Sequence, residues 1–598
     1  MEFFTFVLLF LLSCSHDVFS YRITGPTSGV NAQTGERPAR RDLRTLQASG
    51  AQWDLYIQGV QMFQAANQAD LLSWYSVSGI HGRPYRSWDG VNGPYQRGYC
   101  THGSILFPTW HRPYLSLYEQ IIWNNTQTIA KQYPTTNRAT YQAAADSFRI
   151  PYWDWAASAA MPSSLTSSTL TINTPTGSKS VTNPLFRYTF HPTVGAPDFP
   201  SGEGFQNAPY TTRSGSAASN LNANAASIHD RTYLLLSRQT SYQPFSNHAY
   251  VDSRGNQYDS VEGIHDTIHG LVGGWMGLVP YSAYDPIFWL HHTNVDRLFA
   301  IWQALNPGSY GGSQKNTAGT FTIAPGTTET FTTGLTPFHS DAGTALYTSD
   351  KVRSTRSFGY TYPEVRDWGL TATQVSANTR AAVKKLYDPN NQFTPRGVSV
   401  DKRQGNSDPG KSITIPPSLK NGTARAYREW YANIRVNKFA QQESFFIHMF
   451  IGDVPADPAT WLQSTPSFVG TFVVFMDNAM NNGQDLKIVG QIPMTRKLVE
   501  LYNAGTIADL EPRTIRPYLK KNLQWRAQRY DQSEIRLQDL PSLKVFVLSS
   551  KVEPPKNKDT DFPTYGDLVP EPAITDGKTG GVPANADAAA LAAGNPPA

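Results

Sequence analysis

Four histidines close together in the chain constrain its fold more than any other feature. His265 and His269 are four residues apart in VEGIHDTIHG, and His291 and His292 are adjacent in DPIFWLHHTNVDRL. Residues four apart in a helix lie on one face, so His265 and His269 can bind one metal ion together. A second helix beginning near Asp285 would bring the adjacent pair to the same ion. Three imidazoles leave coordination positions open, which indicates a catalytic metal site.

A second set of three histidines lies upstream. His111 falls in FPTWHRPYLSLYEQIIW, where the apolar spacing predicts a helix, while His81 and His102 border a stretch rich in Gly, Pro and Tyr that is typical of a loop. Two sets predict two metal ions, and imidazole ligands suit copper, zinc or iron better than magnesium or calcium. A zinc protease needs Glu directly after the first histidine of the helical pair, where this chain has Asp266, so that class is disfavoured.

Several blocks of the sequence resemble the type 3 copper proteins, and among them the fungal tyrosinases. These blocks are GIHG, GYCTHG, FPTWHRPYLSLYEQ, PYWDW, VEGIHDTIH and DPIFWLHHTNVDRL, and the resemblance covers roughly residues 40 to 390. It implies a mainly α catalytic domain, a four-helix bundle that holds two copper ions and carries long loops. The ligands implied are His81, His102 and His111 for CuA, and His265, His269 and His292 for CuB. His291 is then a neighbour of the site and not a ligand.

The same resemblance implies roles for residues beside the ligands. Glu262 would orient a water that helps to take the proton from a phenol, and Phe288 would be an aromatic gate over CuB. Cys100 would be joined to His102 by a thioether. Asp266 occupies a position where Asn is common in enzymes that hydroxylate monophenols, so a carboxylate there could act as a base or anchor a salt bridge. This departure leaves the balance between hydroxylation and oxidation open.

Further residues are expected to support the ligands from outside. Phe107 lies one helical turn before a CuA ligand of the same helix and should pack beside it. Asn294 and Asp296 are expected to hold the neighbouring backbone and imidazoles in place, with Arg297 as their partner. Asp154, between two tryptophans, is a candidate buried carboxylate with an indirect supporting role.

Composition and pattern divide the chain into five segments. Residues 1–20 contain an apolar run too short to span a membrane and are predicted to be a signal peptide, which implies a secreted or cell-wall protein. Residues 21–388 form the catalytic domain, in which residues 162–260 are expected to be mainly long surface loops. Residues 389–412 are predicted to be a linker that a protease cleaves, because they are rich in Pro, Gly and Asn and include Lys402 and Arg403.

After the linker, the pattern changes to short runs of β-forming residues. Residues 413–555 are predicted to form a β-sandwich, which the resemblance implies would shield the active site with an inserted side chain. Phe446 and Phe450 are two of several aromatic candidates for that side chain. Residues 556–598 are rich in Pro, Gly, Ala and Asp and are predicted to be disordered. Of two glycosylation sequons, Asn421 is favoured over Asn124, which lies on a predicted helix.

These observations predict a secreted, latent tyrosinase, a polyphenol oxidase with two copper ions. Its substrates would be O2 and phenols, which it would ortho-hydroxylate and oxidise to o-quinones in melanin or phenol metabolism. The alternatives are a catechol oxidase, an o-aminophenol oxidase and, more remotely, an oxygen carrier of the haemocyanin type. A net charge of +5 over 598 residues without a dense basic cluster predicts no nucleic-acid partner. An activating protease is expected, and the oligomeric state is left open.

Overall fold

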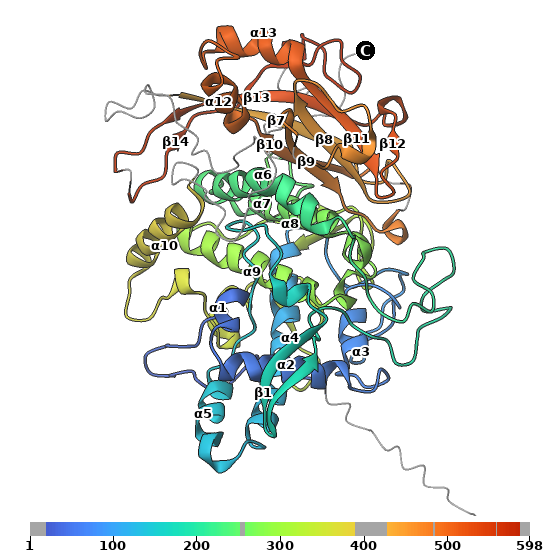
Figure 1. Ribbon diagram of the computed structural model, residues 1–598, viewed down its shortest axis with the longest axis vertical. Coiled ribbons are helices and arrows are strands. Elements are labelled where there is room, and N and C mark those ends of the chain that lie inside the picture. The colour runs from blue at the N-terminus through green and yellow to red at the C-terminus, as the bar shows by residue number, and fades with distance from the viewer. Residues whose placement is uncertain are drawn as a thin grey trace, which may run out of the picture.

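Helices dominate the chain up to residue 388 and antiparallel strands dominate it from residue 427 (Figure 1). The computed structural model describes residues 20–251, 258–388 and 427–586, except 464, 482, 484 and 558. This arrangement confirms the predicted combination of a helical domain and a domain rich in strands. We call them the helical domain and the β domain.

Four helices form the centre of the helical domain. They are α2 (Ala51–Gln64), α4 (Phe107–Ala130), α8 (Val261–Val272) and α9 (Ile287–Leu305). Helix α2 packs on α4, α4 on α9, and α9 on α8. Helix α8 begins where the Ser260 side chain accepts a hydrogen bond from the Gly263 amide, and it ends at Gly273, whose φ of +63° is in the left-handed region. All 12 residues of α8 are buried, so it runs through the core.

Shorter elements surround these four helices. The helices are α1 (Leu43–Gln47), α3 (Trp74–Gly79), α5 (Thr135–Asp146), α6 (Ala217–Arg238), α7 (Tyr242–Ser246) and α10 (Ala372–Tyr387). The strands pair as hairpins: β1 (Thr169–Thr174) with β2 (Gly177–Thr182), β3 (Ser313–Asn316) with β4 (Thr327–Thr330), and β5 (Gly334–His339) with β6 (Leu346–Thr348). The expectation of long loops over residues 162–260 is wrong for α6, a helix of 22 residues that packs on α8.

The β domain consists of two antiparallel sheets. The first has the order β10 (Lys487–Pro493), β7 (Tyr427–Asn437), β13 (Lys544–Glu553) and β14 (Thr564–Tyr565), with β15 (Val569–Pro570) also paired to β13. The second has the order β12 (Glu534–Ile535), β11 (Leu523–Arg529), β8 (Phe445–Ile451) and β9 (Phe468–Val474). The two sheets meet where the Phe472 ring of β9 lies against Gly490 of β10. A Cβ atom on Gly490 would be only 2.5 Å from that ring. Helices α12 (Thr495–Asn503) and α13 (Pro512–Asn522) flank this sandwich.

The predicted disorder from residue 556 is wrong for most of that segment. Strands β14 and β15 pair with β13, and the side chains of Val582 and Ala586 are buried in a cluster with Tyr431 and Phe546. The segment is ordered because β13 offers it hydrogen-bonding partners and an apolar surface. Residues 587–598, the predicted linker and Asn421, and residues 1–19 of the predicted signal peptide lie outside the described residues. No helix in the described part of the chain has the length and apolar character needed to cross a membrane.

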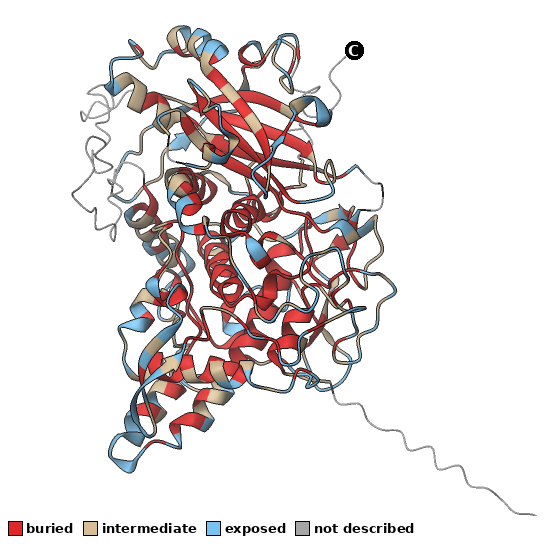
Figure 2. Cartoon of the chain, turned by 45° about the vertical axis from the view of Figure 1, so that its right-hand side comes forward, coloured by how far each residue is buried: buried red, intermediate tan, exposed pale blue. Residues whose placement is uncertain are grey.

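The β domain packs directly on α8 and on the segment that precedes it. A Cβ atom on Gly270 of α8 would lie 2.6 Å from Cγ1 of Val473 in β9, so only glycine permits this approach. The Val489 amide of β10 donates a hydrogen bond of 2.9 Å to the carbonyl oxygen of His248. Buried residues fill the interior of both domains, and one apolar cluster includes residues of each (Figure 2).

Candidate metal centre

Six predicted ligand histidines converge at the centre of the helical domain. They come from different elements and are at most 2% exposed: His81 follows α3, His102 lies in the loop before α4, His111 is on α4, His265 and His269 are on α8, and His292 is on α9. The two sets face each other, since the ring centroids of His111 and His292 are 4.4 Å apart and those of His102 and His265 are 6.1 Å apart. The structure therefore brings together residues separated by up to 211 positions (292 − 81).

Main-chain carbonyl groups orient three of these imidazoles. Each accepts a hydrogen bond from a ring Nδ1 atom: Val279 from His81 at 3.1 Å, Phe107 from His111 at 2.7 Å, and Met276 from His269 at 2.8 Å. With Nδ1 engaged in this way, the Nε2 atom of each ring points into the site. Such outer hydrogen bonds fix the tautomer and the orientation of histidines that bind metals.

The inner nitrogen atoms fit a pair of metal ions. The Nε2 atoms of His81, His102 and His111 are buried and have no hydrogen-bond partner among the described residues. Burial lowers the pKa of His111 to about 4 and the pKa values of the other five ligands well below 6.5. All six rings are therefore neutral, with lone pairs available to a cation. Buried nitrogens without partners are unfavourable in an apolar core, whereas imidazole donors are well suited to copper.

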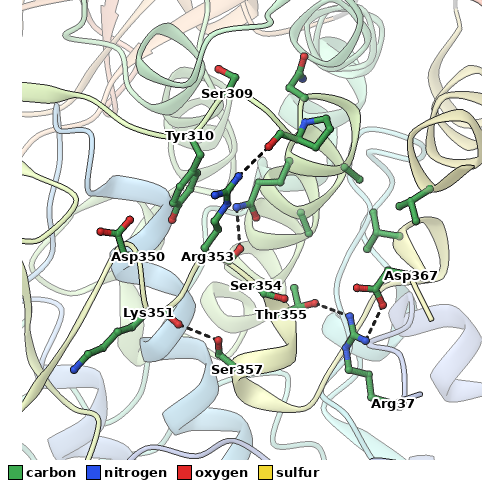
Figure 3. A pocket seen from close by; sticks show the side chains of 17 residues that line it. Arg37, Ser309, Tyr310, Asp350, Lys351, Arg353, Ser354, Thr355, Ser357 and Asp367 are labelled. Carbon is green, nitrogen blue, oxygen red and sulfur yellow. Dashed lines mark hydrogen bonds and ion pairs between the residues drawn. The ribbon is translucent and has the colours of Figure 1, made fainter. Parts of the chain in front are cut away.

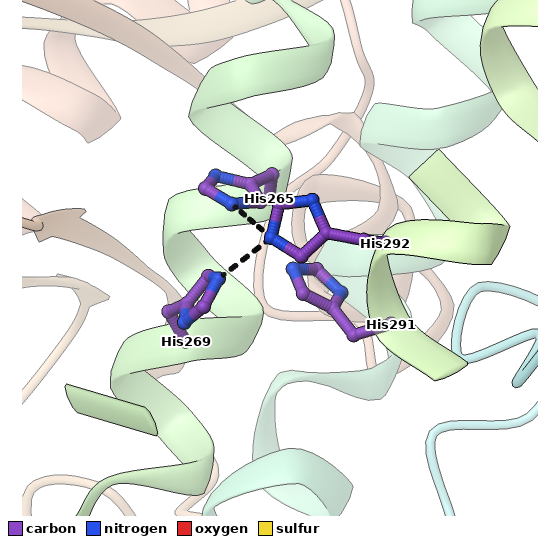
Figure 4. A group of neighbouring side chains, drawn as sticks. All are labelled: His265, His269, His291 and His292. Atoms are coloured by element: carbon purple, nitrogen blue, oxygen red, sulfur yellow. Dashed lines mark hydrogen bonds between the residues drawn. The ribbon is translucent and has the colours of Figure 1, made fainter. Parts of the chain in front are cut away.

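The adjacent histidines of α9 differ in how they meet the ligands of α8 (Figure 4). The Nε2 atom of His292 lies 3.1 Å from Nε2 of His265 and 3.3 Å from Nε2 of His269. His291 belongs to the same buried group, but its ring stacks on His265 with centroids 5.0 Å apart and also contacts Trp155. The shared short contacts make His292 the better candidate ligand.

Cys100 lies beside His102 as the resemblance implies, and Phe107 packs beside His111 as the helical spacing predicts. The Sγ atom of buried Cys100 is 3.4 Å from Nδ1 of His102, and burial raises the pKa of the thiol well above its usual value. The Phe107 ring is 4.8 Å from His111 and 4.9 Å from His265, so it forms part of the wall of the site. A covalent bond between Cys100 and His102 stays a prediction.

Phe288 lies in the wall of the site. Its ring centroid is 4.1 Å from that of His292 and 4.9 Å from that of His81, and its other side contacts Trp289 in the core. The side chain is fully buried. Its predicted role as a gate stays a prediction.

His248, which the sequence did not identify, lies between the two predicted acidic residues. Its Nδ1 atom is 2.9 Å from Oδ2 of Asp266, and its Nε2 atom is 3.7 Å from Oε1 of Glu262. Asp266 also lies 3.0 Å from Nδ1 of His265, while the Gly103 amide donates to both oxygens of Glu262 at 2.8 and 3.0 Å. Burial raises the pKa of Glu262. No spacing in the sequence connects His248 with the helix that carries these acids.

Asp296 supports the site through charged groups from other parts of the chain. Its carboxylate is 2.7 Å from Nε of Arg112 and 3.2 Å from Nη1 of Arg40, and it accepts hydrogen bonds of 2.6 Å from the hydroxyl groups of Tyr360 and Tyr362. Burial alone would raise the pKa of Asp296, but Arg112 and Arg40 hold it below its usual value. Arg112 and His111 are neighbours on α4, so this network fixes the helix next to a ligand.

The predicted partnership of Arg297 with Asp296 is wrong. Arg297 donates to Asn294, as expected, but forms its ion pairs with Asp154 at 3.1 Å and Glu364 at 2.8 Å. Adjacent residues of a helix point about 100° apart, so Asp296 and Arg297 meet different neighbours. Asp154 is therefore a buried carboxylate with a charged partner, and its indirect role in supporting the copper site stays a prediction.

Phe475 of the β domain covers the site. Its ring stacks on His269 with centroids 4.3 Å apart and planes inclined by 18°, and it is 6.0 Å from His265 and 6.3 Å from His102. Phe446 instead contacts Tyr530 beside α8, and Phe450 packs on Phe468 within the β domain. Neither of the two named candidates is therefore the inserted residue.

A surface cavity of about 340 Å³ lies away from the histidines (Figure 3). Arg37, Tyr310, Arg353 and Asp367 are among the residues that line it, and none of the six ligands does. Access to the ligands in this state is instead limited by the ring of Phe475.

Six neutral imidazoles presented by a helical bundle define a protein with a dinuclear type 3 copper centre. The chain matches the family described as the common central domain of tyrosinase over residues 71–305, and the tyrosinase C-terminal domain over residues 429–547. It is 31% identical to a tyrosinase of Neurospora crassa, over 93% of this chain and 98% of that protein. It is 34% identical to a tyrosinase of Podospora anserina, over 80% of this chain and 95% of that protein.

Solved structures agree with this assignment. A structure of recombinant mushroom tyrosinase has a TM-score of 0.78 and 27% identity, and the match covers 92% of this chain and 98% of that one. A holo-protyrosinase from Aspergillus oryzae shares the fold, with a TM-score of 0.68 at 23% identity over 92% of this chain and 97% of that one. The chain belongs to the tyrosinase family. It is a copper-dependent tyrosinase or polyphenol oxidase, which acts on phenols and O2.

Proposed function

We propose that this chain is the latent form of a secreted tyrosinase that ortho-hydroxylates monophenols and oxidises o-diphenols to o-quinones. The observation that carries the latency is the Phe475 ring stacked on His269, where an aromatic substrate would otherwise approach the ligands. Solved structures of latent mushroom tyrosinase and of Aspergillus oryzae pro-tyrosinase support a precursor of this kind. A protease that cleaves between residues 389 and 412 would allow the β domain to leave.

The helical domain provides a rigid and dry environment for the reaction. When bound, the two copper ions supply the redox chemistry between O2 and the phenol. The six imidazoles hold those ions in place, and the hydrogen bonds on Nδ1 keep the ligand rings from rotating. Phe107 and Phe288 exclude water from two sides, which strengthens electrostatic interactions inside the site.

We assign Glu262 as the group that accepts the proton of the phenol. A phenol has a pKa of ~10, so a base must assist its ionisation at neutral pH. Burial raises the pKa of Glu262, which makes its carboxylate a better proton acceptor. Transfer through one water molecule would let Glu262 act while it remains bonded to the Gly103 amide.

Asp266 is less suited to be the base. One of its oxygens is hydrogen-bonded to Nδ1 of His265 at 3.0 Å, and the other lies 2.9 Å from Nδ1 of His248 without forming a hydrogen bond, so the carboxylate is held between two imidazoles. We therefore propose that Asp266 orients the His265 ring. This arrangement is also compatible with a catechol oxidase or an o-aminophenol oxidase, in which hydroxylation is weak.

The test is oxygen consumption and quinone absorbance with tyrosine and with a catechol. Both are measured on copper-loaded protein before and after limited proteolysis of the 389–412 segment. Activity on both substrates that appears only after cleavage supports the latent tyrosinase. Activity on the catechol alone would identify a catechol oxidase, and full activity without cleavage would contradict latency.

Two further parts of the proposal have separate tests. Secretion with cleavage after Ser20 predicts that the exported protein begins at Tyr21, which N-terminal sequencing would establish. A thioether between Cys100 and His102 would remove one hydrogen from each side chain, with O2 accepting the two electrons and two protons. Mass spectrometry of the peptide would then show the loss of two hydrogen masses. A role in melanin or phenol metabolism and glycosylation at Asn421 complete the proposal.

A further inference from the structure

Phe475 is not the only side chain that the β domain inserts into the helical domain. Two residues further on, the carboxylate of Asp477 is 3% exposed and accepts a hydrogen bond of 3.0 Å from the hydroxyl group of Tyr85. Alternate residues of an extended chain are about 7 Å apart. The inserted segment thus presents an aromatic ring and, a short distance away, a carboxylate.

The receiving side of this contact has unusual features. Tyr85 has a φ of +57°, a conformation that is uncommon for residues other than glycine and that often marks functional sites. The guanidinium group of Arg83 lies 4.5 Å from the centre of the Tyr85 ring and pairs with Glu203. The Tyr85 hydroxyl is the side-chain donor to Asp477, and the positive charges of Arg83 and Arg97 favour the ionised carboxylate there without forming ion pairs with it.

We propose that Tyr85, with the charges of Arg83 and Arg97, forms a carboxylate subsite of the active enzyme. In the latent state Phe475 and Asp477 together occupy the place of an aromatic acid, the ring on His269 and the carboxylate on Tyr85. The substrate class is therefore phenols that carry a carboxylate on a short aliphatic arm. This inference rests on the proposed function, because it assumes that phenols bind where Phe475 lies.

The environment of Asp477 differs from the one that a substrate would meet. Burial beneath the β domain raises the pKa of Asp477 to about 6, while Tyr85 and Arg83 act in the opposite direction and Glu203 opposes them. A substrate carboxylate that binds after the β domain has left would keep water on one side. It would therefore gain from the Tyr85 hydroxyl and the two arginines with less loss of hydration.

The experiment compares four copper-loaded, full-length variants. The first is F475G, which opens the ring position while Asp477 stays on Tyr85. The second, F475G/D477A, opens both positions. The third and fourth add Y85F or Y281F to the second. Y281F is the matched control, because it also removes a buried tyrosine hydroxyl, one that donates to Glu203 and not to Asp477.

Isothermal titration calorimetry then gives the affinity of each variant for 3-phenylpropionate and for 3-phenylpropionamide, which have the same shape but differ in charge. In F475G/D477A the acid is expected to bind about tenfold more tightly than the amide, as for a hydrogen bond to a charged group. F475G and the Y85F variant should show no such preference, and the Y281F variant should retain it. Equal affinities for the acid and the amide in F475G/D477A, including no binding of either compound, would overturn the inference. An equal loss of the preference for the acid in the Y85F and Y281F variants would also overturn it.

Oxygen consumption with 4-methylcatechol, measured on the same preparations, separates this inference from the proposed function. Preference for the acid without oxidation of the catechol would leave the subsite standing and contradict the phenol oxidase. Oxidation of the catechol without preference for the acid would support the enzyme and overturn the subsite.

Discussion

The phenyl ring of Phe475 lies face to face with the imidazole of His269, at a centroid distance of 4.3 Å. One residue belongs to the β domain and the other to the helix that carries two of the ligands. The contact therefore couples the position of a whole domain to access to the copper centre.

Replacing Phe475 by glycine is expected to activate the uncut chain. F475G removes the ring that covers His269 but keeps the β strands that hold the domain, so small diphenols can reach the ligands. We expect the rate of oxidation of 4-methylcatechol by the uncut protein to rise at least tenfold. The control is F450G, because Phe450 packs within the β domain on Phe468. An uncut F475G protein as inactive as the parent would show that another group blocks the site.

Substituting Gly270 should loosen the β domain without disturbing the fold of α8. An alanine Cβ atom would lie 2.6 Å from Cγ1 of Val473, so the two domains must separate slightly. Alanine otherwise favours a helix over glycine by ~1 kcal/mol. G270A should therefore be cleaved faster in the 389–412 segment and show higher activity before cleavage. G215A is the matched control, since no atom lies within 4 Å of a Cβ built there, and equal behaviour of both variants would argue against this contact.

The Asp477 contact predicts how pH affects docking of the β domain. In the closed state its pKa is raised from 3.8 to about 6, mainly by burial, so the closed state favours the protonated acid. This stabilisation of the docked β domain is fully present below about pH 4. It is lost as pH rises through 6, by roughly 3 kcal/mol in all. In chains cut at the linker, size-exclusion chromatography should show more dissociation at pH 7 than at pH 4, and D477N should flatten this dependence. Greater dissociation of the parent at pH 4 would contradict the assignment.

Asp296 is expected to be essential for the stability of the helical domain. D296N removes the charge that Arg112 and Arg40 share in a fully buried position. Removing one partner of a buried ion pair lowers the free energy of unfolding by about 3 to 5 kcal/mol. Urea unfolding followed by tryptophan fluorescence would measure this loss. D539N, in an exposed pair with Arg536, should change stability by less than ~1 kcal/mol, and similar values for both variants would refute the prediction.

Removing copper should destabilise the folded chain. The apoprotein keeps six buried, neutral imidazoles directed at one another, whereas a metal bound only by the native state adds about 4 kcal/mol at 1,000 times its Kd. Dialysis against a copper chelator is expected to lower Tm, and Cu²⁺ should restore it. Mg²⁺ should not, because it prefers oxygen ligands. A Tm unchanged by chelation, with copper loss verified by elemental analysis, would contradict the expectation.

Helix geometry predicted only part of the metal site, and the full ligand set followed from the resemblance of short motifs to those of the type 3 copper proteins. His265 and His269 need only a regular helix to meet one ion. The β domain was likewise visible as short runs such as SFFIHMFIG. Contacts between distant segments left no such pattern: nothing local distinguishes Phe475 from Phe472, the other aromatic residue of FVVFM, and His248 reaches Asp266 only through the fold.

The errors also have physical causes. The tail rich in Pro and Gly looked disordered, but β13 supplies hydrogen bonds and the cluster around Tyr431 buries Val582. Arg297 follows Asp296 directly in the sequence, but adjacent side chains of a helix diverge, so Arg297 pairs with Asp154 and Glu364 instead. Composition describes only the segment itself. The order of the tail and the ion pairs of Arg297 depend on the parts of the fold against which these residues pack.

The hydrogen bond from Val489 to His248 has a consequence for the fragment that cleavage releases. Strand β10 lies at the end of its sheet, so departure leaves its outer amides unpaired, next to the exposed side chains of Val473 and Phe475. Such an edge readily pairs with other strands, including those of a second released copy. Self-association would remove the fragment from solution and keep it from docking again, which would make the switch from latent to active enzyme a one-way event.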